Sequence, residues 1–178
     1  MARRRGRSQR PRSPWTPALL VLLVGAAAVA WWVAAHRPSD VEVYFVRVDA
    51  AHHKGLLEPV RRPAPRGPVD ARLDSALRSL LAGPGRRDLL TEIPPGTTLL
   101  GVRVEGGTAT VNFSKHYAVG GGSSSMLGRV WQVVYTATQF PGAPAVQILI
   151  EGRRVDVLGG EGLMIGAPLR RPPSPPSF

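Results

Sequence analysis

The chain has 178 residues, a hydrophobic content of 43% and a net charge of +11 at pH 7. This length suits one domain with extensions, and this hydrophobic content excludes a wholly disordered protein. Because the sequence contains no cysteine, disulfides, cysteine-based zinc sites, thiol catalysis and a lipidated N-terminal cysteine are excluded.

The positive charge is unevenly distributed along the chain. Six arginines fall within the first twelve residues, and the chain from His36 onward keeps a net charge of about +5 with both signs interspersed. Nucleic-acid binding would need basic residues clustered on one face together with exposed aromatic side chains, and only 6% of the residues are aromatic. We therefore expect no nucleic-acid partner.

The N-terminal part predicts a membrane anchor. Residues 1–14 form a basic tail, and residues 15–35 contain no charged side chain, so this stretch is long enough to cross a bilayer core. The arginines place the N-terminus in the cytoplasm and the rest of the chain outside the bacterial inner membrane, with Trp31 and Trp32 at the outer interface. The alternative is a signal peptide cleaved after Ala35, although the apolar run exceeds an ordinary signal core.

Residues 36–40 are expected to be a linker to a domain of residues 41–166. Apolar residues at helical spacing predict a helix over 69–82, ended by glycine and proline. β-Branched residues and period-two alternation predict strands, which we place at 41–48, 100–104 and 108–113, with a possible short strand within 56–62. Gly106 and Gly107 form the turn between the last two strands.

Residues 108–152 form the unit around which the domain is expected to be built. After the strand at 108–113 comes a glycine loop, and the serines at 123–125 can cap a helix. The apolar face of that helix is expected to consist of Leu127, Val130, Trp131, Val134 and Thr138. A helix end at Pro141 and a buried apolar strand at 146–150 follow.

The element order predicts an α+β fold. We expect a β-α-β-β-α-β two-layer sandwich, with two helices packed on one face of a mixed or antiparallel sheet and a possible last edge strand within 154–158. Residues 167–178 are expected to be a proline-rich tail without core-forming residues.

The sequence offers no convincing catalytic group. Ser114 and His116 are two residues apart and would share one face of a strand, but no acidic residue and no nucleophile motif accompanies them. His52 and His53 are not part of a residue pattern typical of a metal site. We therefore expect no catalytic residue, no cofactor and no metal site. The alternative is a secreted or membrane-tethered envelope hydrolase, active on peptidoglycan, that uses Ser114.

Short motifs in the domain resemble those of the GerMN domain, found in the sporulation and germination protein GerM and in other bacterial envelope proteins. They occur in the expected order at residues 43–45, 57–62, 76–84, 93–97, 111–114, 135–141, 146–152 and 168–170. The resemblance covers about residues 41–171. It implies a membrane-tethered, extracytoplasmic, non-enzymatic domain that is similar in fold to ring-building modules and binds proteins or envelope components. GerM itself looks like a lipoprotein with two such domains, so only the domain-level expectation carries over.

We accordingly expect an interaction or assembly module in the cell envelope, with envelope proteins or a second copy as partners and the inner membrane as the anchor. The candidate interaction surface consists of exposed polar residues beside the core: Arg61, Arg62, Ser114, His116, Tyr117, Ser123 and Ser124.

Overall fold

The computed structural model describes residues 24–29, 31, 39–159 and 163–178, and the chain divides into two compact units, Met1–Arg37 and Pro38–Phe178. In the first unit, residues 24–29 and 31 are helical, and Trp31 is 73% exposed. Among the described residues, no helix has the length and apolar character needed to cross a membrane. Most of the predicted anchor, Trp32 included, lies outside the described residues.

The second unit opens with a long β-hairpin. β1 (Ser39–Asp49) and β2 (Lys54–Ala64) pair antiparallel over their whole length, in register from Ser39 opposite Ala64 to Asp49 opposite Lys54. The short strand expected within 56–62 is therefore a full partner of β1. Val41, Val43 and Phe45 of β1 share one face of the strand and are buried, and Tyr44 and Val46 on the other face are buried too.

The main sheet is mixed. β3 (Leu99–Glu105) and β4 (Thr108–Phe113) are antiparallel, and Gly106 and Gly107 join them with φ values of +55° and +77°. Such angles suit the two-residue hairpin turn that this pair of strands needs. β5 (Ala145–Ile150) lies parallel to β4.

Short strands complete the sheet region. β6 (Arg153–Arg154) and β9 (Leu169–Arg170) both pair antiparallel with β5, while β7 (Val157–Leu158) and β8 (Leu163–Met164) pair with each other. The last edge strand expected within 154–158 is thus divided between β6 and β7.

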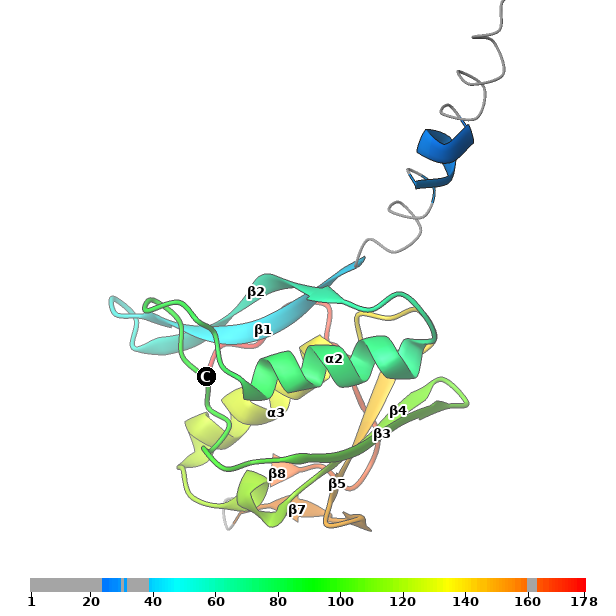
Figure 1. Ribbon diagram of the computed structural model, residues 1–178. Helices are drawn as coiled ribbons and strands as arrows, with labels where there is room; N and C mark the ends of the chain where they lie inside the picture. Colours follow the sequence, from blue (N-terminus) through cyan, green and yellow to red (C-terminus); the bar gives the residue numbers. More distant parts are fainter. Residues whose placement is uncertain (1–23, 30, 32–38, 160–162) are drawn as a thin grey trace, which may run out of the picture. The chain divides into compact units, whose positions relative to one another are not determined.

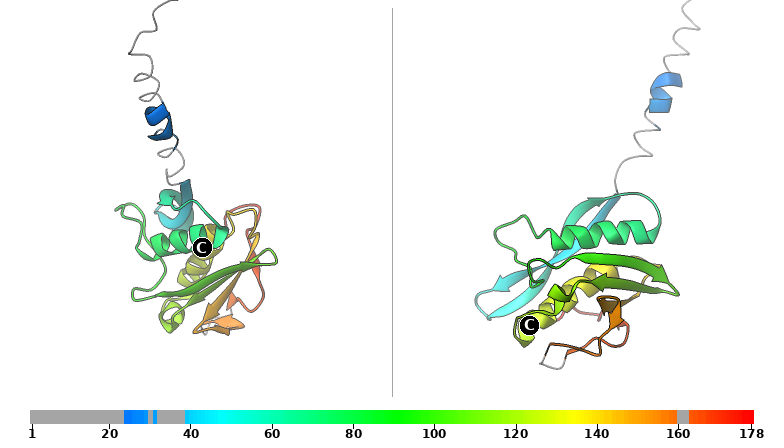
Figure 2. Two further views of the ribbon diagram at one scale, coloured as in Figure 1. Left: turned by 45° about the vertical axis from the view of Figure 1, so that its right-hand side comes forward. Right: turned by 60° about the horizontal axis from the view of Figure 1, so that its bottom comes forward.

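The two helices lie between the hairpin and the main sheet (Figures 1 and 2). α2 (Val69–Leu81) contacts β1, β2 and β3, and α3 (Ser123–Ala137) contacts β1, β2 and β5. The expectation of an α+β fold with a mixed sheet is confirmed. The expectation of helices on one face of a single sheet is wrong, because the hairpin forms a separate sheet on the other side of the helices.

The burial of α3 on several sides explains why it lies between two sheets. Ten of its residues are buried, from Met126 to Ala137, and they point in nearly every direction around the helix. A helix buried on several sides needs more than one neighbouring layer. Of the apolar face expected from the sequence, Val130 and Val134 are buried, whereas Leu127, Trp131 and Thr138 are only half-buried.

The C-terminal residues also differ from the expectation of a tail without core contacts. Leu169 and Arg170 extend the main sheet as β9. The guanidinium of Arg171 then lies 5.2 Å from the ring of Tyr44 and 4.6 Å from the ring of Tyr135. The tail is therefore packed against β1 and α3.

Candidate interaction surface

A buried arginine holds the loop that links β4 to α3. Arg129, on α3, is 1% exposed. Its guanidinium donates to four backbone carbonyls: Nη1 to Tyr117 (2.6 Å) and Val119 (3.3 Å), Nη2 to Gly120 (3.0 Å), and Nε to Glu92 (3.2 Å). Burial lowers the pKa of Arg129, but an arginine stays charged at neutral pH. Charge-assisted hydrogen bonds to carbonyls offset the cost of burying that charge.

Tyr117 belongs to the core. It lies on the short 3₁₀-helix η1 (Lys115–Ala118) and is fully buried. Its ring stacks on Phe113 at a centroid distance of 4.6 Å, and its hydroxyl donates to the carbonyl of Arg129 at 3.3 Å. Burial raises the pKa of the Tyr117 hydroxyl. The side chain of Tyr117 therefore anchors the loop and is absent from the exposed surface.

Ser114 is also used by the fold. Its side chain is 7% exposed, and its Oγ accepts a hydrogen bond from the backbone N–H of Thr98 at 3.0 Å. Its own N–H donates to the carbonyl of Thr98 at 2.9 Å. His116 is exposed on η1. Among the described residues, no three His, Asp or Glu side chains come together in a way that could hold a metal ion.

Ser123 and Ser124 are exposed in the first turn of α3. The residue at the helix cap is Gly122, one position before the serines that were expected to provide the cap. Glycine is tolerated at this position, although it offers no side-chain acceptor. The exposed part of the predicted loop surface consequently consists of His116, Ser123 and Ser124.

Arg61 and Arg62 do not join that loop. They are neighbours on β2, so their side chains leave opposite faces of the strand. Arg61 is exposed, whereas Arg62 is half-buried and donates to the carbonyl of Pro84. β2 and η1 lie on opposite sides of the two helices (Figure 1). The residues predicted as one surface therefore occupy at least two separate parts of the domain.

The outer edge of β1 is closed by side chains. Gln139 Nε2 and Oε1 bind the carbonyl and N–H of Glu42 at 2.7 and 2.8 Å. The N–H of Tyr44 donates to Thr136 Oγ1 at 3.1 Å, and its carbonyl accepts from Gln132 Nε2 at 3.0 Å. Val46 exchanges both backbone bonds with Leu90, each at 2.9 Å. These side chains and the backbone of Leu90 occupy the place that a neighbouring strand would take.

Sequence reasoning missed this arrangement. Gln132, Thr136 and Gln139 recur at four- and three-residue steps, so they share one side of α3 and its C-terminal end. A polar stripe of this kind resembles a solvent-facing surface. The length and regularity of β1 could have indicated this arrangement. A long strand has two edges, and the backbone groups of the edge that does not face β2 also need partners.

The outer edge of β3, by contrast, is open. Glu105 and Thr108 close the two-residue hairpin, so the backbone groups of Val102 and Val104 point away from β4. Within the described residues, no strand pairs with this side of β3. Leu100, at the start of the same edge, is 50% exposed. An unpaired strand edge is a template for a strand from another chain.

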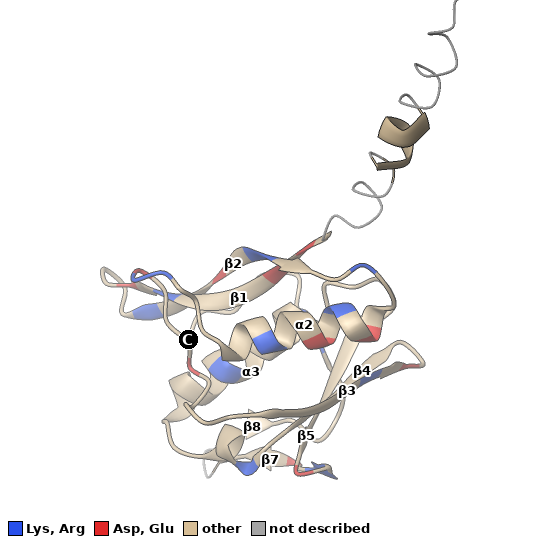
Figure 3. Ribbon diagram, viewed as in Figure 1, with Lys and Arg blue, Asp and Glu red and all other residues tan. Residues whose placement is uncertain are grey.

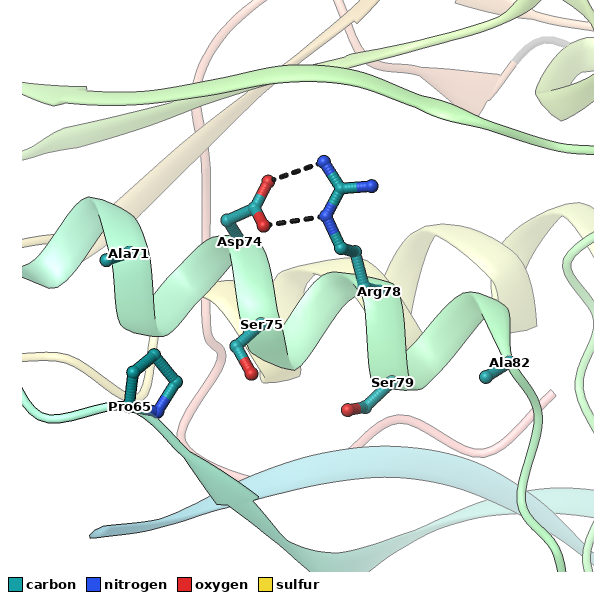
Figure 4. A pocket seen from close by; sticks show the side chains of 7 residues that line it. All are labelled: Pro65, Ala71, Asp74, Ser75, Arg78, Ser79 and Ala82. Atoms are coloured by element: carbon teal, nitrogen blue, oxygen red, sulfur yellow. Dashed lines mark hydrogen bonds and ion pairs between the residues drawn. The ribbon is translucent and has the colours of Figure 1, made fainter. Parts of the chain in front are cut away.

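A shallow groove of about 620 Å³ follows the exposed side of α2 (Figure 4). Asp74 and Arg78 form an ion pair on one flank of it, with Nε to Oδ2 at 2.7 Å and Nη2 to Oδ1 at 3.1 Å. The other lining side chains are small or apolar: Pro65, Ala71, Ser75, Ser79 and Ala82.

Charged side chains of both signs are interspersed over the domain (Figure 3). On the hairpin, Glu58 accepts hydrogen bonds from Arg47 and Arg86, and Arg86 also binds Asp88. The hydrogen bond from Arg47 is the main cause that holds the pKa of Glu58 below its usual range. Paired surface charges of this kind contribute little stability individually.

The sequence profile of the Germane family, described as sporulation and spore germination, matches residues 42–156. This match confirms the resemblance inferred from the motifs. No curated protein sequence matches the chain.

Solved structures of other proteins share the fold. The first GerMN domain of the sporulation protein GerM from Bacillus subtilis has a TM-score of 0.60 and 21% identity, covering 75% of this chain and 98% of that one. The tandem GerMN domains of the same protein have a TM-score of 0.61 and 20% identity, and the match covers 76% of this chain and 46% of that one. A proposed lipoprotein from Clostridium perfringens has a TM-score of 0.55 and 22% identity, and the match covers 76% of this chain and 89% of that one.

Proposed function

Since this chain belongs to the Germane family of sporulation and spore-germination proteins, we propose that it is a non-enzymatic interaction module of the bacterial cell envelope. The N-terminal segment tethers it to the inner membrane, and the domain of residues 38–178 acts outside the cytoplasm. The fold similarity to a proposed lipoprotein supports an envelope location.

The observation that carries the proposal is the difference between the strand edges. The β1 edge is closed by α3, whereas the β3 edge offers the backbone groups of Val102 and Val104 to another chain. We expect an envelope protein or a second copy to add a strand there. The exposed residues His116, Ser123 and Ser124, and Arg61 on the hairpin, remain candidate additional contacts.

Photocrosslinking in the producing cells tests the β3 edge. A photoreactive residue replaces Leu100 in the full chain, and the control carries it at Met164 on β8; the two residues are 50% and 66% exposed. We expect a discrete crosslinked product from position 100 and none from position 164. Val102→Pro should abolish the product, because proline removes a donor that points away from β4. Equal crosslinking from both positions would refute the edge as the interface.

The location is tested by labelling. The chain contains no cysteine, so Ser124→Cys introduces a single thiol at an exposed position. We expect a membrane-impermeant maleimide to label this variant in intact protoplasts. Labelling only after lysis would place the domain in the cytoplasm.

The hydrolase alternative makes a separate prediction. A nucleophilic Ser114 would react with a fluorophosphonate probe, and Ser114→Ala would lose the label. We expect no labelling of either protein, because Ser114 Oγ is engaged with the backbone of Thr98. Labelling that depends on Ser114 would replace the interaction proposal with an enzymatic one.

A further inference from the structure

The end of the tail is bound to β2. The N–H of Gly55 donates to the carbonyl of Phe178 at 2.6 Å, and the N–H of Phe178 donates to the carbonyl of Gly55 at 3.2 Å. Two opposite residues of antiparallel strands exchange hydrogen bonds in this way, so Phe178 is bonded to the outer edge of β2 as a residue of a neighbouring strand would be. Further along the same edge, Pro59 and Pro63 cannot donate backbone hydrogen bonds.

The ring of Phe178 fills a socket made by two glycines. A Cβ on Gly55 would lie 2.5 Å from Phe178 Cε2, and a Cβ on Gly128 would lie 2.6 Å from the same atom. Glu92 forms a third wall, since its Cγ lies 2.7 Å from the Cβ position of Gly128. Any larger residue at either glycine would therefore displace the ring or its neighbours.

Neither glycine is required by the backbone. Positive φ angles occur at other glycines, but not at Gly55 or Gly128. In the interior of a helix, glycine destabilises by about 1 kcal/mol relative to alanine. Gly128 sits in the middle of α3, so the room it leaves for an aromatic ring is the physical reason for a glycine there.

The tail is fastened at two points. Arg171 and Pro172 bind Tyr135, through Arg171 Nη2 to its carbonyl and through the Tyr135 hydroxyl to the carbonyl of Pro172 at 3.2 Å. Phe178 provides the second attachment, and the residues between are mostly exposed. A segment with so few buried contacts opens at low free-energy cost.

We propose that Gly55, Gly128 and the adjoining edge of β2 form a binding site for an aromatic side chain on an extended, proline-containing peptide. Residues 172–178 of the same chain are its intramolecular ligand, and a partner segment of the same chemistry replaces them. This site is separate from the β3 edge, so either assignment stands without the other.

The test uses the full chain with the socket emptied by Phe178→Ala. A fluorescent peptide, Pro-Pro-Ser-Pro-Pro-Ser-Phe, corresponding to residues 172–178, is titrated against this variant, and anisotropy is measured. We expect saturable binding of the peptide to Phe178→Ala. The affinity of the unmodified chain for the peptide should be at least about tenfold lower, because its own tail competes from a high effective concentration. The same peptide ending in alanine should not bind.

Two further substitutions, each added to Phe178→Ala, locate the site. Gly128→Ala and Gly55→Ala should each abolish peptide binding, because each methyl group fills the socket. Gly101→Ala is the matched control, since its Cβ meets nothing within 4 Å, and it should bind normally. Circular dichroism confirms that α3 is kept in Gly128→Ala. Absence of binding to Phe178→Ala, or equal binding by the glycine variants, overturns the proposal.

Discussion

The two helices show how differently polar side chains can be used in one small domain. On α2, Asp74 and Arg78 pair at the surface beside an open groove. On α3, Arg129, Gln132 and Thr136 are at most 1% exposed, and each binds backbone groups of another segment. The exposed ion pair of Asp74 and Arg78 on α2 can be altered with little consequence for the fold. The polar groups of α3, by contrast, bind backbone groups that would otherwise be buried without a partner.

The largest effect is expected from Arg129→Met. The substitution keeps an apolar stem but leaves the carbonyls of Tyr117 and Glu92, among others, without their donor. We expect the free energy of unfolding to fall by about 3–4 kcal/mol, measured by urea denaturation. The matched control on α2 is Arg78→Met, which should change it by less than about 0.5 kcal/mol. Equal effects at the two positions would remove the contrast between the helices.

Gln132→Leu should have the next largest effect. Leucine has a similar size, but it cannot bind the carbonyl of Tyr44 or accept from the N–H of Glu92, which lie 3.0 and 2.8 Å from the glutamine amide. Two buried backbone groups lose their partner, so we expect a loss of about 2–3 kcal/mol by the same measurement. A loss below about 0.5 kcal/mol would mean that water or another group satisfies this part of the β1 edge.

A smaller and more local effect is expected from Thr136→Val. The two side chains have nearly the same shape, and only the hydroxyl that accepts from Tyr44 N–H is lost. We expect destabilisation by about 1 kcal/mol, together with faster hydrogen exchange of the Tyr44 amide. The amide of Glu42, which binds Gln139, serves as the internal reference. Unchanged exchange at Tyr44 would show that the hydroxyl does not close the edge.

The smallest effect is expected from Asp74→Asn on α2. This change removes the charge of an exposed i,i+4 ion pair with Arg78, and such pairs contribute about 0.3–0.5 kcal/mol. The small difference in the free energy of unfolding between this variant and the unmodified chain should vanish at 1 M salt, where the charges are screened. A loss above about 1 kcal/mol would show that the groove side of α2 is more tightly coupled to the core than its exposure suggests.

Most element positions could be predicted because they depend on local pattern. The helix at Val69–Leu81 and the strand at Ala145–Ile150 each lie within one residue of the expected bounds. Alternation also identified β3, β4 and the glycine turn between them. The pattern of a strand does not specify its neighbours, however, and β1 was wrongly assigned to the main sheet.

The candidate site could be predicted only in part. The loop before α3 was found from its glycines and serines, but Tyr117 is buried beneath it. Arg129 and Gln132 were missed because a polar residue on a helix looks the same in sequence whether it meets water or a buried carbonyl. The tail was misjudged for a related reason: Arg171 and Phe178 are held by contacts with residues distant in the sequence, and composition carries no information about such contacts.

The closure of β1 by α3 also has a consequence in time. The side chains that bind Glu42 and Tyr44 at this edge lie 88–97 positions further along the chain, at Gln132, Thr136 and Gln139. At a synthesis rate of about 5–20 residues per second, Glu42 and Tyr44 of β1 are synthesised roughly 5–20 s before these side-chain partners. During that interval, a long apolar strand has one unsatisfied side. Newly made chains are therefore most exposed to strand mispairing before α3 emerges.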